Sequence, residues 1–328
     1  MRRSPPDPSE GRGPVSRSTT APEDTRSPDA RPMKSSTRAM LTALWKREFH
    51  LKAARLDHGE PEHFVRCQWQ SRVRVHLVYL TYRWFLALLF VATMIFSICD
   101  TGRSPKSTGL RYISKWPIYL TNWGYTVCTL QAVLGAYLLT QRLIMERKPG
   151  FTANASQMSL SYKVYWALNT TGVVMAIGIS VAYWLTVYDP ALHSLDALNL
   201  MVHAFNSVLM VTDLFLVAHP FRLLHCYWPF LVTVCYVVFS FIYYESGGTD
   251  RHDRPFVYPL LDWRLPKRTA ASSVFGLVFV LTVHCAAWVL FLLRKWITLT
   301  VRKKPYTDKG GLAAPELQPA LGVDDTVC

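Results

Sequence analysis

Residues Leu195–Val217 read LDALNLMVHAFNSVLMVTDLFLV, and this stretch decides the fold. It is apolar enough to cross a bilayer, which takes about 20 such residues. Five polar residues interrupt it: Asp196, Asn199, His203, Asn206 and Asp213. In a helix that advances about 100° per residue, all five fall within roughly a third of the circumference. Because polar groups inside a bilayer are costly unless they face other helices, we expect one side of this helix to face a bundle and the other to face lipid.

The rest of the chain supplies the helices of such a bundle. Half of the 328 residues are hydrophobic, and they fall in blocks long enough to span a hydrocarbon core of about 30 Å. We therefore predict an all-α, polytopic membrane bundle of six transmembrane helices within residues 77–293. The predicted spans are Leu77–Cys99, Pro117–Thr140, Val164–Tyr188, Ala197–Ala218, Cys226–Tyr244 and Ala270–Leu293.

Three segments flank this transmembrane domain. Residues 1–35 are polar and rich in Pro, Ser and Arg, which predicts a disordered tail without a cleavable signal peptide. Residues 36–76 carry apolar residues on one helical face opposite basic ones. This pattern predicts an N-terminal amphipathic, juxtamembrane segment, which either lies in the lipid headgroup region or packs on the bundle. Residues 294–328 are predicted to be a basic and then disordered tail.

The formal net charge of +14 comes from basic residues at span ends and in the tails. This placement favours contact with anionic membrane lipids and predicts no nucleic-acid partner. Six spans put both termini on one side, and the excess of Lys and Arg there favours the cytoplasm, in the plasma membrane or the endoplasmic reticulum. The seven cysteines lack metal-site spacing and there is no Gly-rich phosphate loop, so we expect no metal and no cofactor.

Thr121 and His203 are the candidate catalytic residues. Thr121 lies about one turn inside the second span, and His203 lies one to two turns inside the fourth span, which runs in the same direction. The two side chains therefore lie at similar depths in the membrane, as a hydroxyl nucleophile and an imidazole base must in order to reach each other. Asn199 and Asn122 are the supporting candidates, for an oxyanion. The alternative is that these groups only form hydrogen bonds between membrane helices.

Deeper in the bundle, Asp213 of the fourth span and His284 of the sixth lie at comparable depth. They are expected to form either a proton relay or part of a buried ion pair that holds the helices together. Together with Asp196 and Asn206, they make up the expected buried polar network.

Several blocks of the sequence resemble the rolling stone family of multi-span membrane proteins. They are KWPIYLTNWGY (Lys115–Tyr125), LNLMVHAFNSVLMVTDLFL (Leu198–Leu216), HPFRLLHCYWP (His219–Pro229), FSFIYYESGGTDR (Phe239–Arg251) and YPLLDW (Tyr258–Trp263). The similarity covers about Trp45 to Trp296. The family is associated with myoblast fusion in insects, so the resemblance implies a role in membrane or cell–cell processes.

That family is in turn distantly similar to the androgen-induced membrane hydrolases. These enzymes cleave fatty-acid esters of hydroxy fatty acids with an intramembrane Thr and His. The matching pieces are Tyr119-Leu120-Thr121 and the Leu-Asn-x-x-x-His motif from Leu198 to His203. Two functions therefore remain open: a non-enzymatic role in cell–cell fusion, and hydrolysis of a lipid ester by Thr121 and His203. The expected partners are membrane lipids and, for an enzyme, a lipid ester. No protein partner can be named from the sequence.

Overall fold

The computed structural model describes residues 42, 45–46, 48–71, 74–99, 113–151, 158–190 and 195–302. The predicted disordered tail 1–35 and residues 303–328 lie outside this part of the chain. Within the described residues the fold is helical, and the one departure is an isolated bridge between Cys67 and Val217.

The predicted six-helix membrane bundle is confirmed. In the described part of the chain, six helices or helix series are long and apolar enough to cross a membrane, which indicates an integral, multi-pass protein. They are α2 (Leu77–Cys99), α4 (Leu120–Glu146), α5 (Leu160–Ala182) with η5 (Tyr183–Val187), α6 (Ala197–Leu200) with η6 (Met201–Phe205) and α7 (Asn206–Leu216), η7 (Leu223–Cys226) with α8 (Tyr227–Glu245), and α9 (Pro266–Arg302).

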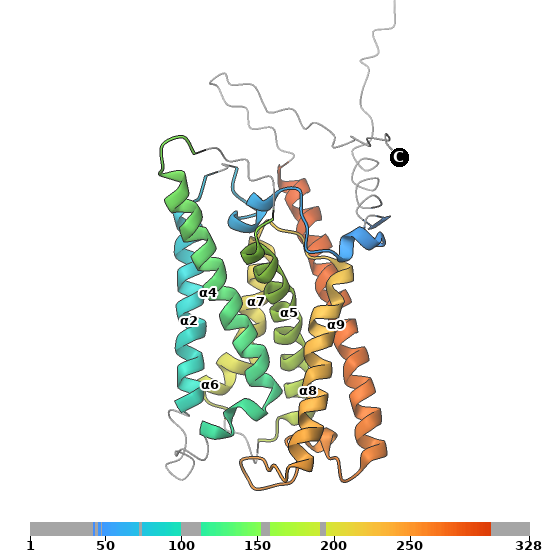
Figure 1. Cartoon of the computed structure of the whole chain (residues 1–328). Coiled ribbons are helices and arrows are strands. Elements are labelled where there is room, and N and C mark those ends of the chain that lie inside the picture. Colours follow the sequence, from blue (N-terminus) through green and yellow to red (C-terminus); the bar gives the residue numbers. More distant parts are fainter. Residues whose placement is uncertain are drawn as a thin grey trace, which may run out of the picture. The chain divides into compact units, whose positions relative to one another are not determined.

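The bundle has two ends, and we name them by the segments they carry. The base end carries residues 48–71, called the base segment, and residues 217–222 between α7 and η7. The cap end carries residues 113–119, which precede α4, and residues 246–265, which join α8 to α9; together these are called the cap. Figure 1 shows the base segment in blue at the upper end and the α8–α9 connection in orange at the lower end.

Helix α5 is the centre of the bundle, because it packs against α4, α7, α8 and α9. Its side chains Trp166, Val173 and Ala176 are fully buried. Small residues allow this close packing: a β-carbon at Gly172 would lie 3.2 Å from Cε of Met210 on α7. Such close approach through small residues is how membrane helices gain contact area.

Helix α9 continues to Arg302, so residues 294–302, assigned to the tail by sequence, are helical. The helix continues past residue 293 because Arg294 binds inside the bundle. Its guanidinium is fully buried and donates to the carbonyls of Leu214 (2.7 Å), Val217 (2.6 Å) and His219 (2.9 Å). A cation at the C-terminal end of α7 satisfies carbonyls that have no partner within that helix.

The base segment packs on the bundle. Glu48 is buried and accepts from Nη1 of Arg222 and the backbone N–H of Leu223, both at 3.0 Å. Backbone hydrogen bonds join Gln68 to Leu216 and Ala218 to Arg66. Phe49 and Leu51, at its start, are exposed apolar side chains.

Candidate functional site

A buried ion pair joins Arg83 of α2 to Asp213 of α7. Nη1 of Arg83 lies 2.6 Å from Oδ1 of Asp213, and the two residues are 1% and 0% exposed. Charges removed this completely from water cost several kcal/mol each unless they are paired and hydrogen-bonded. The pair therefore depends on its remaining neighbours.

Those neighbours come from the surrounding helices. Three neutral side chains also donate to the carboxylate of Asp213: Tyr82 (3.2 Å), Gln131 (2.9 Å) and Asn169 (3.4 Å). Nη2 of Arg83 donates to the hydroxyl of Tyr165 at 2.7 Å. One carboxylate thus joins α7 to α2, α4 and α5. It is saturated with donors, so it serves as a structural joint rather than as an available base.

His284 does not take part in this joint. Its Nε2 faces the carbonyls of Arg222 (3.1 Å) and Leu223 (2.9 Å), at the start of η7. The sequence left a proton relay and a buried ion pair open for Asp213. The structure forms the ion pair, and its partner is Arg83.

A second polar cluster lies toward the cap end, where two π-helical segments, η5 and η6, occur in neighbouring spans. The ring of His203 stacks on that of Tyr183, with centroids 3.5 Å apart and planes 5° apart. Nδ2 of Asn199 donates to the hydroxyl of Tyr183 at 2.6 Å, and Nε1 of Trp184 donates to the carbonyl of His203 at 3.0 Å. Tyr183 therefore joins the two predicted site residues, Asn199 and His203.

Asp196 and Asn206 complete the predicted set on this helix. Asp196 is half-buried and caps α6, because its Oδ1 accepts from the N–H of Asn199 at 2.7 Å. This is the ordinary role of Asp before a first helical turn. Asn206 is 1% exposed and lies one turn beyond His203.

Thr121 has different neighbours. Its hydroxyl lies in hydrogen-bond reach of the phenol of Tyr258 in the cap. Burial raises the pKa of Tyr258 to about 12, so the phenol stays protonated at neutral pH and cannot take a proton from Thr121. Asn122, one residue on, donates from Nδ2 to the carbonyl of Trp116 at 2.6 Å.

The structure therefore separates the candidate catalytic residues into two groups. Thr121 faces Tyr258, whereas His203 and Asn199 contact Tyr183. The contacts described for the Thr121 hydroxyl and for the His203 ring thus go to different tyrosines. Within the same residues, no three His, Cys, Asp or Glu side chains gather as metal ligands would.

Hydrogen bonds join the cap to α8, from the Tyr236 hydroxyl to the carbonyl of Ile118 and from Nε1 of Trp263 to Oγ of Ser240, and others join its two segments to each other. Nζ of Lys115 donates to Oγ1 of Thr249 (2.7 Å) and to the carbonyl of Asp250 (2.6 Å). The Asp250 carboxylate is 1% exposed and accepts from the N–H groups of His252 and Arg254, both at 2.8 Å. Two segments far apart in the sequence are thereby held together.

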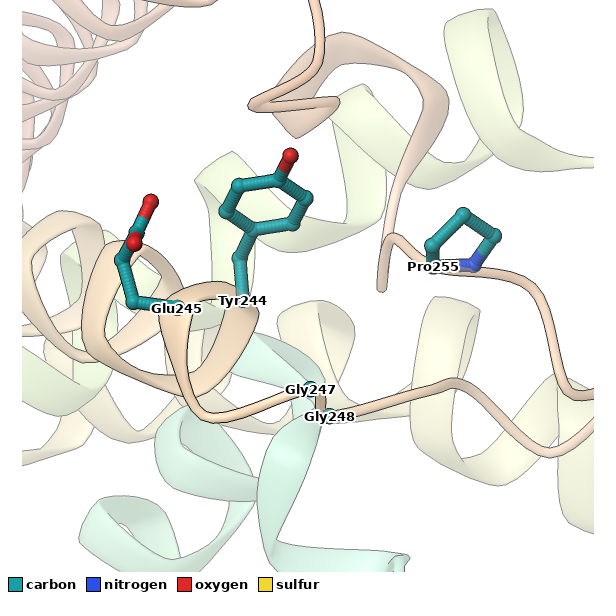
Figure 2. A pocket seen from close by; sticks show the side chains of 5 residues that line it. All are labelled: Tyr244, Glu245, Gly247, Gly248 and Pro255. Atoms are coloured by element: carbon teal, nitrogen blue, oxygen red, sulfur yellow. The ribbon is translucent and has the colours of Figure 1, made fainter.

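A pocket of about 300 Å³ opens where α8 meets the cap. Figure 2 shows the ring of Tyr244 and the carboxylate of Glu245 on the same side of it, with Pro255 across from them. The turn beneath requires glycine, because Gly247 has a φ of +74° and a β-carbon at Gly248 would collide with the ring of Tyr243.

Sequence reasoning missed Arg83, Tyr183 and Tyr258. A signal existed for Arg83, because a lone cation inside an apolar span needs a buried partner. Tyr183 and Tyr258 gave no such signal, since Tyr is common near membrane interfaces.

Comparison with known proteins agrees with this architecture. A family model described as "Protein rolling stone" matches residues 43–304. The protein rolling stone of Drosophila melanogaster is 29% identical over 242 residues, which cover 69% of this chain and 80% of the fly protein. No solved structure gives a significant match. Since the family model spans the base segment, all six transmembrane helices and the cap, this chain belongs to the rolling stone family.

Proposed function

We propose that the protein acts in contact between cells of the kind that leads to fusion, and that the cap meets a protein on the facing cell. Membership in the rolling stone family supports the cell–cell role, since the family resemblance implies fusion. The observation that carries the proposal is that Lys115 joins the two segments of the cap through Thr249 and Asp250. A surface that is already ordered loses less conformational entropy on binding than a loose loop does.

The chemistry of the cap also suits a protein partner. Leu260 and Leu265 are 44% and 49% exposed, although neither belongs to a membrane-spanning helix. Arg254 and Arg264 lie over the ring of Phe256, at 5.5 and 5.4 Å from its centroid. Arginine is enriched among the residues that dominate binding at protein interfaces, and the exposed leucines add apolar area that a partner can cover.

The pocket beside the cap adds a specific feature. Its Tyr244 ring and Glu245 carboxylate are an aromatic face and an acid side by side. This combination suits a cationic side chain, which both groups attract. We expect a partner loop that carries Lys or Arg next to apolar residues.

A content-mixing assay between two cell populations tests the proposal. Each population carries half of a split luciferase, and one or both express the full chain. Wild type should raise mixing above the vector level, and the double variant Leu260→Ser, Leu265→Ser should return it to that level at equal surface abundance. The matched control is Leu51→Ser, which changes an 84% exposed leucine of the base segment and should leave mixing unchanged. Wild type that never exceeds the vector overturns the proposal.

A further inference from the structure

Three buried polar side chains near the cap end of α5 and α6–α7 each leave one atom without a hydrogen-bond partner in the described part of the chain. These atoms are Oγ of Ser180, Oδ1 of Asn199 and Oδ1 of Asn206. The residues are 7%, 3% and 1% exposed. Because lipid offers no hydrogen bonds, an unpaired polar atom inside a membrane protein is costly and calls for an explanation.

Two of these side chains, Ser180 and Asn206, lie on the base side of one contact between the two spans, and Asn199 lies on its cap side. Tyr183 of η5 bonds to Asn199 and stacks on His203. Ser180 precedes Tyr183 by three residues and Asn206 follows His203 by three, and residues three apart on a helix share a face. Because the two spans run in opposite directions, Ser180 and Asn206 lie at the same level, one turn closer to the base end.

The backbone is irregular at the same place. Both η5 and η6 are π-helical, and they lie in spans that contact each other. A π-helical turn is a costly departure from the α-helix, and it occurs often at functional sites. Two of them beside the same unpaired side chains mark this region as a site rather than as ordinary helix packing.

The region is closed toward the base end. Sγ of Cys128 lies 3.5 Å from the carbonyl of Gly172, and Met210 fills the space above Gly172. All three residues are buried. This apolar layer separates Ser180 and Asn206 from the Asp213 ion pair, so the region can be reached from the cap end or from the lipid but not from the base.

We propose that Ser180 and Asn206 form a binding site for a hydroxyl group. A hydroxyl donates to the Asn206 carboxamide oxygen and at the same time accepts from the Ser180 hydroxyl, so it matches both groups. Neither residue carries a charge, which favours a neutral ligand. The hydroxyl belongs either to an internal water molecule or to a neutral membrane lipid. A lipid would enter beside η5 and η6, where Leu185 and Phe205 are 78% and 50% exposed.

The test measures the melting temperature of the full-length protein purified in detergent. Replacing an unbonded polar atom with an apolar group of similar shape is neutral or stabilising, whereas removing a bonded one destabilises. We expect Asn206→Leu to lower the melting temperature by several degrees. Ser180→Ala, which adds no bulk, should act in the same direction. The control Thr282→Val removes an exposed hydroxyl of α9 that bonds only its own helix, and it should change little.

Two lipid probes identify the source of the hydroxyl. For a lipid, a monoacylglycerol should raise the melting temperature of wild type, its dimethyl ether should not, and Asn206→Leu should abolish the effect. For water, neither probe acts and both variants still melt at lower temperature. If Asn206→Leu and Ser180→Ala are as stable as wild type or more so, with and without monoacylglycerol, the site is empty and the proposal is overturned.

Discussion

Gly135 of α4 lies so close to Nη2 of Arg83 on α2 that no β-carbon fits between them. The guanidinium cannot move away without losing hydrogen bonds, because Nη1 donates to Asp213 and Nη2 donates to the hydroxyl of Tyr165. The glycine is therefore the complement of the buried ion pair: its missing side chain is the space that the arginine occupies.

Gly135→Ala should for this reason destabilise the fold. The added methyl group forces Arg83 away from Asp213, and leaving a buried charge without its partner costs about 3–5 kcal/mol. The melting temperature of the purified protein measures the effect. Gly276→Ala on α9 is the control, because no atom lies within 4 Å of a β-carbon there. It should leave the melting temperature unchanged or raise it slightly, as Ala favours helix by about 1 kcal/mol over Gly.

The ion pair itself should behave as a unit. Asp213→Asn leaves the buried Arg83 cation uncompensated and should cost about 3–5 kcal/mol, with a large loss of folded protein. The double change Arg83→Met, Asp213→Asn removes both charges and keeps an acceptor for Tyr82, Gln131 and Asn169, so it should recover most of that loss. The yield of monodisperse protein and its melting temperature measure both effects. A double variant that is as unstable as the sum of its single changes would contradict this coupling.

Helix number and the polar side of the fourth span could be predicted because both follow from local periodicity. Asp213 was recognised as buried for the same reason. Its partner was not, since pairing Arg83 with Asp213 requires knowing that α2 and α7 meet around α4 and α5. Thr121 and His203 illustrate the same limit. The depth of a residue in the membrane follows from its position along the helix. Its neighbour does not, because Tyr258, the cap residue that faces Thr121, lies more than a hundred residues further along the chain.

His219, at the base end, should make the free energy of unfolding depend on pH. The ring is buried, stacks on Phe64 (centroids 5.0 Å apart, planes 6° apart) and meets Tyr165 edge-on. Burial, and then the charge of Arg294, holds the pKa of His219 well below 6.5. The folded protein keeps this ring neutral while the unfolded chain protonates it, so stability falls as the pH drops below about 6.5, by about 1.4 kcal/mol per pH unit.

Melting temperatures at about pH 7.5 and about pH 5.5 test this assignment, because the two values lie on either side of the unfolded-state pKa. His219→Phe keeps a ring against Phe64 but cannot titrate, so its loss of stability on acidification should be smaller than that of wild type. Other titratable groups contribute equally to both proteins and cancel in the comparison. Equal losses in the two proteins would show that His219 does not carry the dependence.

The contacts of Thr121 predict that it does not act as a nucleophile. A threonine hydroxyl reacts with an acyl or phosphonyl group only when a base takes its proton, and Thr121 faces the protonated phenol of Tyr258 while His203 stacks on Tyr183. A fluorophosphonate probe should therefore label wild type, Thr121→Ala and His203→Ala equally weakly. Thr126→Ala is the control on the same helix, since that hydroxyl bonds the carbonyl of Asn122 at 2.7 Å. Labelling that disappears in both Thr121→Ala and His203→Ala but persists in Thr126→Ala would establish the lipid-ester hydrolase instead. It would also require a conformation in which α4 and η6 bring the two side chains together.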